Sequence, residues 1–486
     1  MDKKKNVLMI CCDHWFAQLL GCAGHPDIMT PTLDYLANHG VRFNQCYSEC
    51  PVCIPARRTL MTGMSPRTHG DRVYSDTMPM PDATTLAQAF REQGYQTYGV
   101  GKLHVYPQRN RIGFDDVKLL EEGRYEFGVV DDYQIWLGEN GYLGQEYTHA
   151  MGNNNYLTRP WHLDEKAHPT SWVTQEMMRQ IKRMDPTRPA FFYCSYPFPH
   201  PPLVPLQAFL DMYDERELQP PVGQDWLGEQ YIFKALGEQE RIYSDREIRR
   251  AKRAFYAQCT HIDYSIRLLI GTLRECNLLD NTLIAFVSDH GDLLFDHEMV
   301  AKRSFYEQAT RVPFILSGEP LREKAGTVVN DLAELADVMP TLLDLCGIPI
   351  PGTVEGRALL NENVSPREYV YGEVSEGLKA TRMIRRGDYK LIYYPCGNVK
   401  QLFRLSDDPG ESRDLSSLPE HAQALSQLEA LLIQNLYGDD LKWIQDGRLT
   451  GFPEPPYTEN ADYGLYNQRG YHWPVPVGYA NKGKNA

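Results

Sequence analysis

The segment VLMICCDH, residues 7–14, is a short apolar run that stops abruptly at two polar residues. Three later segments have the same form: QTYGVG (96–101) before Lys102-Leu103-His104, AFFYCSYPFP (190–199) before His200, and LIAFVS (283–288) before Asp289-His290-Gly291. Runs this short and almost wholly apolar are typical of strands that are buried on both faces. Each run therefore predicts a central strand whose carboxyl end presents residues capable of chemistry.

Segments with helical signals lie between these runs. Residues 30–40 begin with Thr-Pro and end in Gly40, and residues 84–94 begin with a threonine and end in Gly94. This alternation predicts an α/β fold with a large, mostly parallel sheet sandwiched by helices. Sites in such sheets form beyond the carboxyl ends of the strands, so the four polar ends can converge on one pocket.

The sequence pattern changes after about residue 365. The runs EYVYGEV (368–374) and MIRRGDYKLIYY (383–394) predict antiparallel strands, and Leu418 to Leu436 predicts an amphipathic helix. We therefore expect a large α/β domain over residues 1–365 and a smaller C-terminal α+β domain over residues 366–450. The irregular tail, residues 451–486, is rich in Pro, Tyr, Gly and Asn, and is a candidate contact for a homo-oligomer.

Composition excludes several classes of function. The 486-residue chain has a formal net charge of −14, so it lacks the basic surface of a nucleic-acid binder. No stretch approaches the length of a membrane span. The lysines before residue 7 look like the start of a signal peptide, but the apolar run is short and no small-residue cleavage site follows it. We therefore expect a cytoplasmic protein whose 11 cysteines are mostly reduced thiols.

The stretch SECPVCIPARRTLMTG, residues 48–63, contains two overlapping patterns. Cys50 and Cys53 form a C-x-x-C, which is typical of redox chemistry. Cys53, Pro55 and Arg57 form a C-x-P-x-R that is followed by Thr62-Gly63, on a segment with helical signals. This second pattern resembles the signature of the type I sulfatases, a family of the alkaline phosphatase superfamily in which the cysteine is oxidised to formylglycine.

The resemblance extends over most of the first 400 residues. Asp13 stands where the family has its first metal-ligand pair, and six elements in all follow the family's order. They are Asp13, Gly101-Lys102-Leu103-His104, Pro199-His200-Pro201-Pro202, Ser288-Asp289-His290-Gly291-Asp292, Lys302 with Tyr306-Glu307 and Arg311-Val312-Pro313, and Arg386–Leu391 with Leu402-Phe403. The resemblance implies an alkaline-phosphatase-like fold and a sulfuric ester hydrolase.

The family mechanism, placed on these positions, implies a role for each residue. Cys53 becomes formylglycine and hydrates to a gem-diol, one hydroxyl of which attacks sulfur with the help of a metal and Asp289. His200 or Lys302 protonates the leaving alcohol. His104 then takes a proton from the second hydroxyl, so that sulfate leaves and the aldehyde forms again.

The chemistry of sulfate esters fits these residues independently of the resemblance. Hydrolysis places negative charge on oxygen, so the site needs a cation cluster, a nucleophile and an acid. Arg57, Lys102 and Lys302 supply positive charge, and the resemblance gives Arg57 the task of holding the hydrated aldehyde. Lys102 and His104 share one side if their segment is extended. Cys53 at a helix N-terminus lies where backbone N–H groups favour anions.

The resemblance also implies one divalent metal ion, held by Asp13, His14, Asp289, His290 and the residue made from Cys53. The family often has a carboxylate or an amide where this chain has His14, and asparagine where it has His290. Calcium is the first expectation by resemblance, but calcium prefers oxygen ligands. Two imidazoles make manganese a second candidate, with magnesium a third.

Two rival functions remain open. A phosphonate monoester or phosphodiester hydrolase of the same fold can also use formylglycine. The pair Asp289-His290 slightly favours this hydrolase, whereas Lys102 with His104 favours a sulfatase. A non-catalytic binding homologue that is never modified is opposed by Cys53 beside two metal-ligand pairs. We expect as partners a small-molecule or saccharide sulfate ester and a formylglycine-generating maturase. Aryl, sugar and choline esters all remain candidates, with specificity in the loop from Tyr125 to Trp161 and in the tail.

Overall fold

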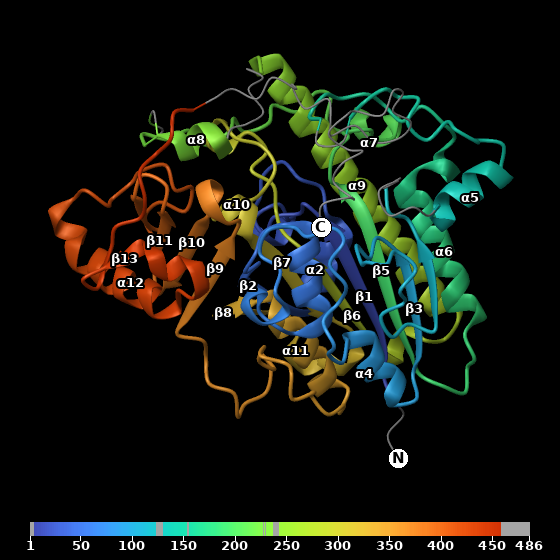
Figure 1. The fold of residues 1–486 in the computed structure, drawn as a ribbon. Helices are drawn as coiled ribbons and strands as arrows, with labels where there is room; N and C mark the ends of the chain where they lie inside the picture. The colour runs from blue at the N-terminus through green and yellow to red at the C-terminus, as the bar shows by residue number, and fades with distance from the viewer. Residues whose placement is uncertain are drawn as a thin grey trace.

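The computed structural model describes residues 4–122, 130–152, 155–226, 228, 230–236 and 243–457. Its centre is an eight-stranded sheet in the order β4-β3-β5-β1-β6-β7-β2-β8 (Figure 1). The first strand, β1 (Asn6–Asp13), pairs in parallel with β5 (Ala190–Pro199) on one side and with β6 (Thr282–Ser288) on the other. β3 (Gln96–Gly101) continues the parallel set beside β5. The four strands with polar ends are therefore adjacent and parallel, as the sequence predicts.

The outer strands complete the sheet. β4 (Asp116–Leu119) is parallel to β3 at one edge, and β8 (Thr327–Glu334) is parallel to β2 (Gly40–Tyr47) at the other. β7 (Arg311–Ser317) is antiparallel to both of its neighbours, β6 and β2. The prediction of a mostly parallel sheet is confirmed, with one reversed strand that the sequence pattern did not indicate.

Helices cover both faces of this sheet. Alternate residues of β1 divide between the two faces, since side chains along a strand point to opposite sides. Leu8, Ile10 and Cys12 pack with α1 (Pro31–Asn38), α6 (Pro169–Arg183) and α9 (Asp245–Glu275). Val7, Met9 and Cys11 pack with α2 (Cys53–Thr62), α4 (Leu86–Glu92) and α11 (Val338–Leu345). The shorter helices are α3 (Pro66–His69), α5 (Asp132–Glu139), α7 (Gln207–Asp211), α8 (Tyr231–Leu236) and α10 (Glu307–Thr310).

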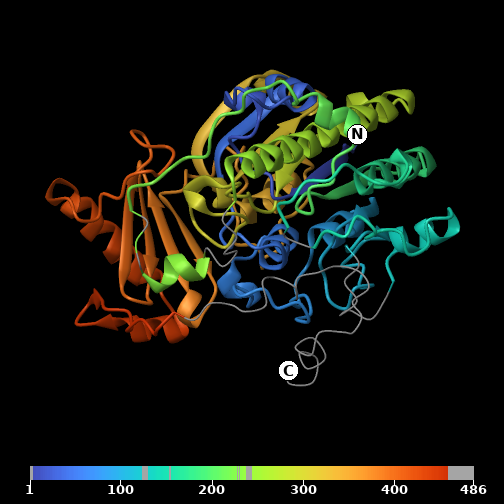
Figure 2. The same ribbon diagram turned by 90° about the horizontal axis from the view of Figure 1, so that it is seen from above.

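A second sheet lies beside the first rather than on it (Figure 2). It is antiparallel, in the order β12-β11-β10-β9, and is formed by β9 (Tyr369–Val374), β10 (Thr381–Arg386), β11 (Tyr389–Tyr394) and β12 (Val399–Arg404). The helix α12 (Ala422–Asn435) packs on one of its faces, and the short strands β13 (Ile444–Gln445) and β14 (Arg448–Leu449) follow. The predicted helix from Leu418 thus begins four residues later, after a 3₁₀ turn over Pro419–His421.

Lys390 of β11 connects the two sheets. Its buried ammonium donates to the Phe305 carbonyl at 2.7 Å, lies 2.8 Å from Glu307 Oε1 and also contacts Glu411. Arg385 of β10 donates to the Tyr47 hydroxyl at 2.6 Å at the end of β2. The contact between the sheets is therefore polar and charged as well as apolar.

Three further expectations concern the chain as a whole. All 11 cysteines lie in the described ranges and each is a free thiol. Among the described residues, no helix combines the length and the apolar character needed to cross a bilayer. Of the predicted tail, residues 458–486 lie outside the described residues, as do residues 125–129 and 153–154 of the loop from Tyr125 to Trp161.

Candidate active site

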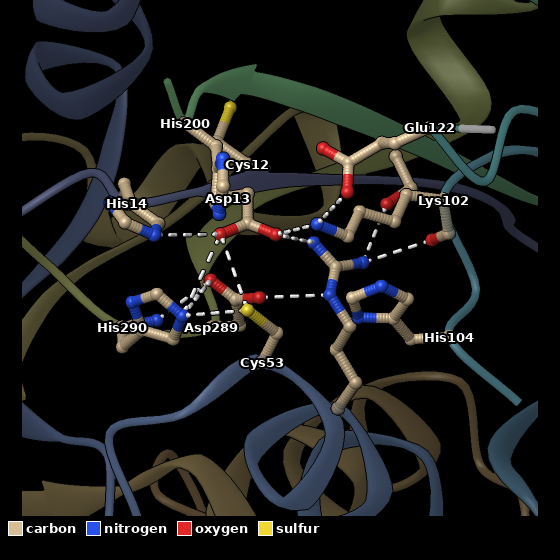
Figure 3. Close-up of polar contacts among 12 residues, drawn as sticks. Cys12, Asp13, His14, Cys53, Lys102, His104, Glu122, His200, Asp289 and His290 are labelled. Carbon is tan, nitrogen blue, oxygen red and sulfur yellow. Dashed lines mark hydrogen bonds and ion pairs between the residues drawn. The ribbon is translucent and has the colours of Figure 1, made fainter. Parts of the chain in front are cut away.

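Polar residues that follow four parallel strands meet at the carboxyl ends of the strands of the main sheet (Figure 3). Asp13 ends β1, Lys102 follows β3, and Asp289-His290 follows β6. His200 follows β5, and the N-terminus of α2 brings Cys53 to the same place. All of these side chains are buried. The predicted convergence of the strand ends is therefore present.

Cys53 is the first residue of α2, a helix that ends at Gly63 with a left-handed φ of 64°. Its Sγ lies 3.3 Å from His290 Nε2 and 3.8 Å from Asp13 Oδ1. Burial and Asp13 raise the pKa of the Cys53 thiol, but Lys302, Lys102 and His290 outweigh them and leave that pKa below its usual value. A cationic environment at a helix N-terminus suits a nucleophile that attacks an anion.

Cys50, the other half of the C-x-x-C, has a different environment. Its Sγ contacts the Arg72 carbonyl at 3.8 Å, and burial together with Asp71 and Glu373 raises the pKa of its thiol well above the usual value. This contact favours a structural thiol over a redox partner for Cys53.

Four of the five predicted metal ligands form one buried group. Asp13, His14, Cys53 and His290 each offer a ligand atom, and these atoms all lie within 4.8 Å of one another. The fifth, Asp289, has its Oδ1 3.7 Å from His290 Nε2. His290 Nδ1 lies 2.9 Å from the Gly291 carbonyl, to which it can only donate, so in the neutral ring Nε2 is the nitrogen that carries the lone pair.

The charges in this group match a divalent cation. Burial and the neighbouring Asp13 raise the pKa of Asp289. Burial also opposes ionisation of Asp13, but Lys102 and Arg57 hold the pKa of Asp13 well below its usual range. Two adjacent carboxylates and imidazole nitrogens are the donors that a divalent transition ion prefers. The residues present therefore fit one divalent metal ion.

His14 belongs to the group and also contacts Lys302. Its Nε2 lies 2.6 Å from Lys302 Nζ and 3.6 Å from Asp13 Oδ1, and its Nδ1 lies 2.5 Å from Asp292 Oδ2. Its backbone is left-handed, with a φ of 73°. Lys302 Nζ in turn lies 3.2 Å from His200 Nε2.

His200 is held as a neutral acceptor. Its Nδ1 lies 2.5 Å from the Pro201 carbonyl, so that nitrogen donates and Nε2 carries the lone pair that faces Lys302. Burial and Lys302 hold the pKa of His200 well below its usual value. Of the two predicted proton donors to the leaving alcohol, this geometry favours Lys302.

Arg57 lies where it orients carboxylates. Its guanidinium donates to Asp289 Oδ2 at 2.8 Å, to Asp13 Oδ2 at 3.4 Å and to the Ser195 hydroxyl at 2.8 Å. A further N–H donates to the Lys102 carbonyl at 2.9 Å. The resemblance implies that Arg57 holds the hydrated aldehyde. Its contacts with Asp289 and Asp13, two predicted metal ligands, were not predicted from the sequence.

Lys102 bridges two buried carboxylates, with its Nζ 2.5 Å from Asp13 Oδ2 and 2.9 Å from Glu122 Oε2. The neighbouring Glu121 accepts the backbone N–H groups of Leu103 and His104 at 2.8 and 3.0 Å. The premise that Lys102 and His104 share an extended segment is wrong, because His104 has a left-handed φ of 57°. Both still lie on the same side of the group (Figure 3).

Glu121 and Glu122 also belong to the site but are not among the residues predicted from the sequence. They follow β4 in the segment DVKLLEE, residues 116–122, which repeats the form of an apolar run with a polar end. That signal is short and contains charged residues, so it differs from the four longer runs. Tyr156 and Ser195 carried no signal of this kind.

Comparisons with known proteins show the family to which the chain belongs. The family model described as Sulfatase matches residues 5–348, and that described as N-sulphoglucosamine sulphohydrolase, C-terminal, matches residues 295–437. An arylsulfatase of Clostridium perfringens is 34% identical over 473 residues, which cover 93% of this chain and 98% of the relative. A choline-sulfatase of Rhizobium meliloti is 30% identical and covers 86% of this chain and 83% of the relative.

Solved structures show the same fold. The phosphonate monoester hydrolase of Agrobacterium radiobacter superposes with a TM-score of 0.73 at 22% identity, over 88% of this chain and 95% of that one. A protein solved in complex with its substrate D-glucosamine-2-N,6-O-disulfate gives a TM-score of 0.72 at 22% identity, over 89% of this chain and 97% of that one.

Proposed function

Because this chain belongs to the sulfatase family of the alkaline phosphatase superfamily, we propose that it hydrolyses sulfate monoesters through a formylglycine made from Cys53. Cys53 carries the proposal. It begins a buried helix, its Sγ lies 3.3 Å from His290 Nε2 and 3.8 Å from Asp13 Oδ1, and the charges of Lys302 and Lys102 lower the pKa of its thiol. The hydrated aldehyde would supply one hydroxyl for attack on sulfur and a second whose deprotonation releases sulfate.

The remaining side chains divide the other tasks between them. Asp13, His14, Asp289 and His290 would hold one divalent cation, which would neutralise charge on the sulfate oxygens. Calcium is the expectation from the family, and the imidazole nitrogens of His14 and His290 make manganese its competitor. Arg57 keeps the two carboxylates in place, since it donates to both of them.

The proton transfers fall to three residues. Lys302 would protonate the leaving alcohol, because His200 presents an acceptor nitrogen to its ammonium. Lys102 would bind a sulfate oxygen as a cation. His104 would take the proton from the second hydroxyl, a task that typically contributes about 10²–10⁴-fold to a rate.

The modification is tested by co-expressing the protein with a formylglycine-generating enzyme. Mass spectrometry of the peptide that contains Cys53 gives the aldehyde content, and hydrolysis of 4-nitrophenyl sulfate gives the rate. We expect the rate to rise in proportion to aldehyde content and to vanish in Cys53→Ala. Cys50→Ala is the matched control and should keep most of the activity. Full activity from protein whose Cys53 is entirely a thiol would refute the mechanism.

The rival function is tested on the same samples. The Asp289-His290 pair and the likeness to a phosphonate monoester hydrolase make an aryl phosphonate ester the matched second substrate. We expect the sulfate ester to be preferred. A wide preference for the phosphonate would favour the rival, and fully modified protein that turns over neither ester would favour a binding homologue.

A further inference from the structure

Glu121 is a buried carboxylate two residues after β4, and none of the steps proposed above uses it. Its Oε1 accepts the backbone N–H of Leu103 at 2.8 Å and that of His104 at 3.0 Å. Its Oε2 lies 3.3 Å from the same N–H of His104. The carboxylate therefore binds the backbone of the residue that we propose as the base.

These two N–H groups lie where the β-ladder ends. The Lys102 N–H still donates to the Ser195 carbonyl of β5 at 3.1 Å, and the Leu120 N–H donates to the Gly101 carbonyl at 3.1 Å. The next two residues, Leu103 and His104, are only 2% and 4% exposed. A buried N–H without an acceptor is costly, so the Glu121 side chain takes over the role that a neighbouring strand has before this point.

The backbone at His104 needs such support. Its φ of 57° is left-handed, a conformation that a residue with a side chain keeps only where its surroundings determine it. Glu121 is itself held in place: its N–H donates to Asp131 Oδ2 at 2.7 Å, and Asp131 Oδ1 accepts the Gln134 N–H at 2.8 Å at the start of α5. The carboxylate that binds the His104 backbone is thus tied to a helix.

Lys102, two residues before His104, is held by other groups. Its Nζ lies 2.5 Å from Asp13 Oδ2 and 2.9 Å from Glu122 Oε2. Two consecutive carboxylates therefore divide the pair between them, with Glu122 at the Lys102 ammonium and Glu121 at the His104 backbone. A change at Glu121 should displace His104 and leave these contacts of Lys102 in place.

We propose that Glu121 is a positioning residue, whose carboxylate fixes the left-handed turn at His104 and thereby places the imidazole for the second proton transfer. The inference rests on the role proposed for His104. In that step the imidazole takes the proton of the second hydroxyl, the C–O bond to sulfate breaks with its electron pair going to sulfate, and the C=O bond forms. A displacement of about 1 Å can cost about 10²-fold in rate.

Two substitutions separate the reach of Glu121 from its charge. Glu121→Gln keeps an oxygen at the same reach and removes the charge, whereas Glu121→Asp keeps the charge and withdraws both oxygens by one methylene. We expect Glu121→Asp to be impaired and Glu121→Gln to be far less so. Glu139→Asp, at an exposed position of α5, is the control. The opposite order would show that the charge of Glu121 acts, and would overturn the proposal.

The kinetic readout is turnover of 4-nitrophenyl sulfate by proteins matched for aldehyde content. The ratio kcat/KM reports the steps up to release of 4-nitrophenol, whereas kcat also includes the later release of sulfate. We expect Glu121→Asp to lower kcat about 10–100-fold, to lower KM with it, and to give a burst of 4-nitrophenol. In the His104→Ala background it should cause no further loss. Equal falls in kcat and kcat/KM would overturn the proposal.

Hydrogen–deuterium exchange of the Leu103 and His104 amides tests the placement without catalysis, on full-length protein whose Cys53 is unmodified. We expect both amides to be protected in the wild type and in Glu121→Gln, and to exchange about 10-fold or more faster in Glu121→Asp. Unprotected amides in the wild type would overturn the proposal even if the variants do not fold. Failure of the formylglycine mechanism would abolish wild-type turnover but leave this exchange pattern, so the two failures are distinguishable.

Discussion

Lys102 is an ammonium group that the fold buries completely. Burying an unpaired charge costs several kcal/mol, so such a group persists only where opposite charges surround it. Burial lowers the pKa of Lys102, but Asp13 and Glu122 more than reverse this effect and leave that pKa above its usual value. Lys102 therefore stays charged, as the sulfate-binding role proposed for it requires.

Glu122→Gln removes one of the two carboxylates that Lys102 contacts. Lys102 should then depend on Asp13 alone, in competition with the divalent cation for that carboxylate. We expect metal affinity and kcat/KM for 4-nitrophenyl sulfate to fall by about 10-fold or more. Glu92→Gln makes the same change at an exposed position of α4 and is the control. Identical metal affinity in the two variants would show that Glu122 does not support the site.

The residues that could be predicted are those that directly follow a strand. Asp13, His14 and His290 belong to one group because the carboxyl ends of parallel strands lie at the same end of the sheet. The apolar runs in the sequence indicate where these strands end. The contact between Asp292 and Tyr156 could not be found in this way. These residues meet across 136 positions of sequence, and no local pattern indicates which distant segments will touch.

The four-strand centre of the sheet, β3-β5-β1-β6, was predictable because each strand is a nearly unbroken apolar run. The direction of β7 was not, since an apolar run has the same pattern in either direction. The 31-residue helix α9 was not singled out either, although Ser244 and Glu247 form a capping box at its start. Its length follows from packing along α6 and the sheet, which sequence pattern does not specify.

Gly101 links β3 to Lys102 where no side chain fits. It has a φ of 102°, and a Cβ there would lie 1.8 Å from the Ser195 carbonyl oxygen of β5. Gly101→Ala must therefore separate β3 from β5 and displace Lys102. We expect a loss of roughly 2–4 kcal/mol in the free energy of unfolding and a large loss of activity, measured by urea titration and by turnover.

Gly94, just before β3, is the matched control for this substitution. Its φ of 83° is also left-handed, but a Cβ there would meet no atom within 4 Å. Gly94→Ala should cost only the conformational strain, about 1–2 kcal/mol, and should keep the activity. Equal losses in the two variants would show that backbone strain, not the approach to β5, governs Gly101.

His261 of α9 gives the fold a dependence on pH. Its ring stacks on Phe209 with the centroids 4.7 Å apart, and burial lowers its pKa to about 3 from 6.5. Between these values the unfolded chain binds a proton that the folded protein rejects, so stability falls as pH falls through this window. His261→Phe removes the effect. From pH 7 to pH 5 the wild type should lose about 2 kcal/mol more unfolding free energy than the variant in urea titrations. Parallel pH profiles would contradict this assignment.

At the scale of the whole molecule, the second sheet is attached through buried charge. Burial opposes ionisation of Glu307, but Lys390, Arg385 and Arg311 lower the pKa of that carboxyl to about 2. Burial raises the pKa of the neighbouring Glu411 to about 7. Lys390 therefore contacts one carboxylate that stays ionised, Glu307, and a second that titrates near neutral pH, Glu411.

Lys390→Met should destabilise the molecule by about 3–5 kcal/mol, because it leaves buried carboxylates without their main partner. Urea unfolding at pH 7 measures the loss. The double variant Lys390→Met/Glu307→Gln removes the stranded charge and should recover part of the stability. If the double variant is no more stable than the single one, the packing of the lysine side chain, not its charge, joins the two sheets.

The position of β1 at the centre of the sheet has a consequence for the timing of synthesis. Asn6 pairs with Thr282, so the first strand lacks its second neighbour, β6, while the ribosome adds the intervening chain, which takes roughly 15–55 s at 5–20 residues per second. During that interval α2 has no completed sheet on which to pack. Cys53, only 2% exposed once folded, would then be accessible to a modifying enzyme. Under the proposed formylglycine mechanism, the aldehyde content of the finished protein would depend on the rate of modification relative to the rate of translation, and slower elongation should increase it.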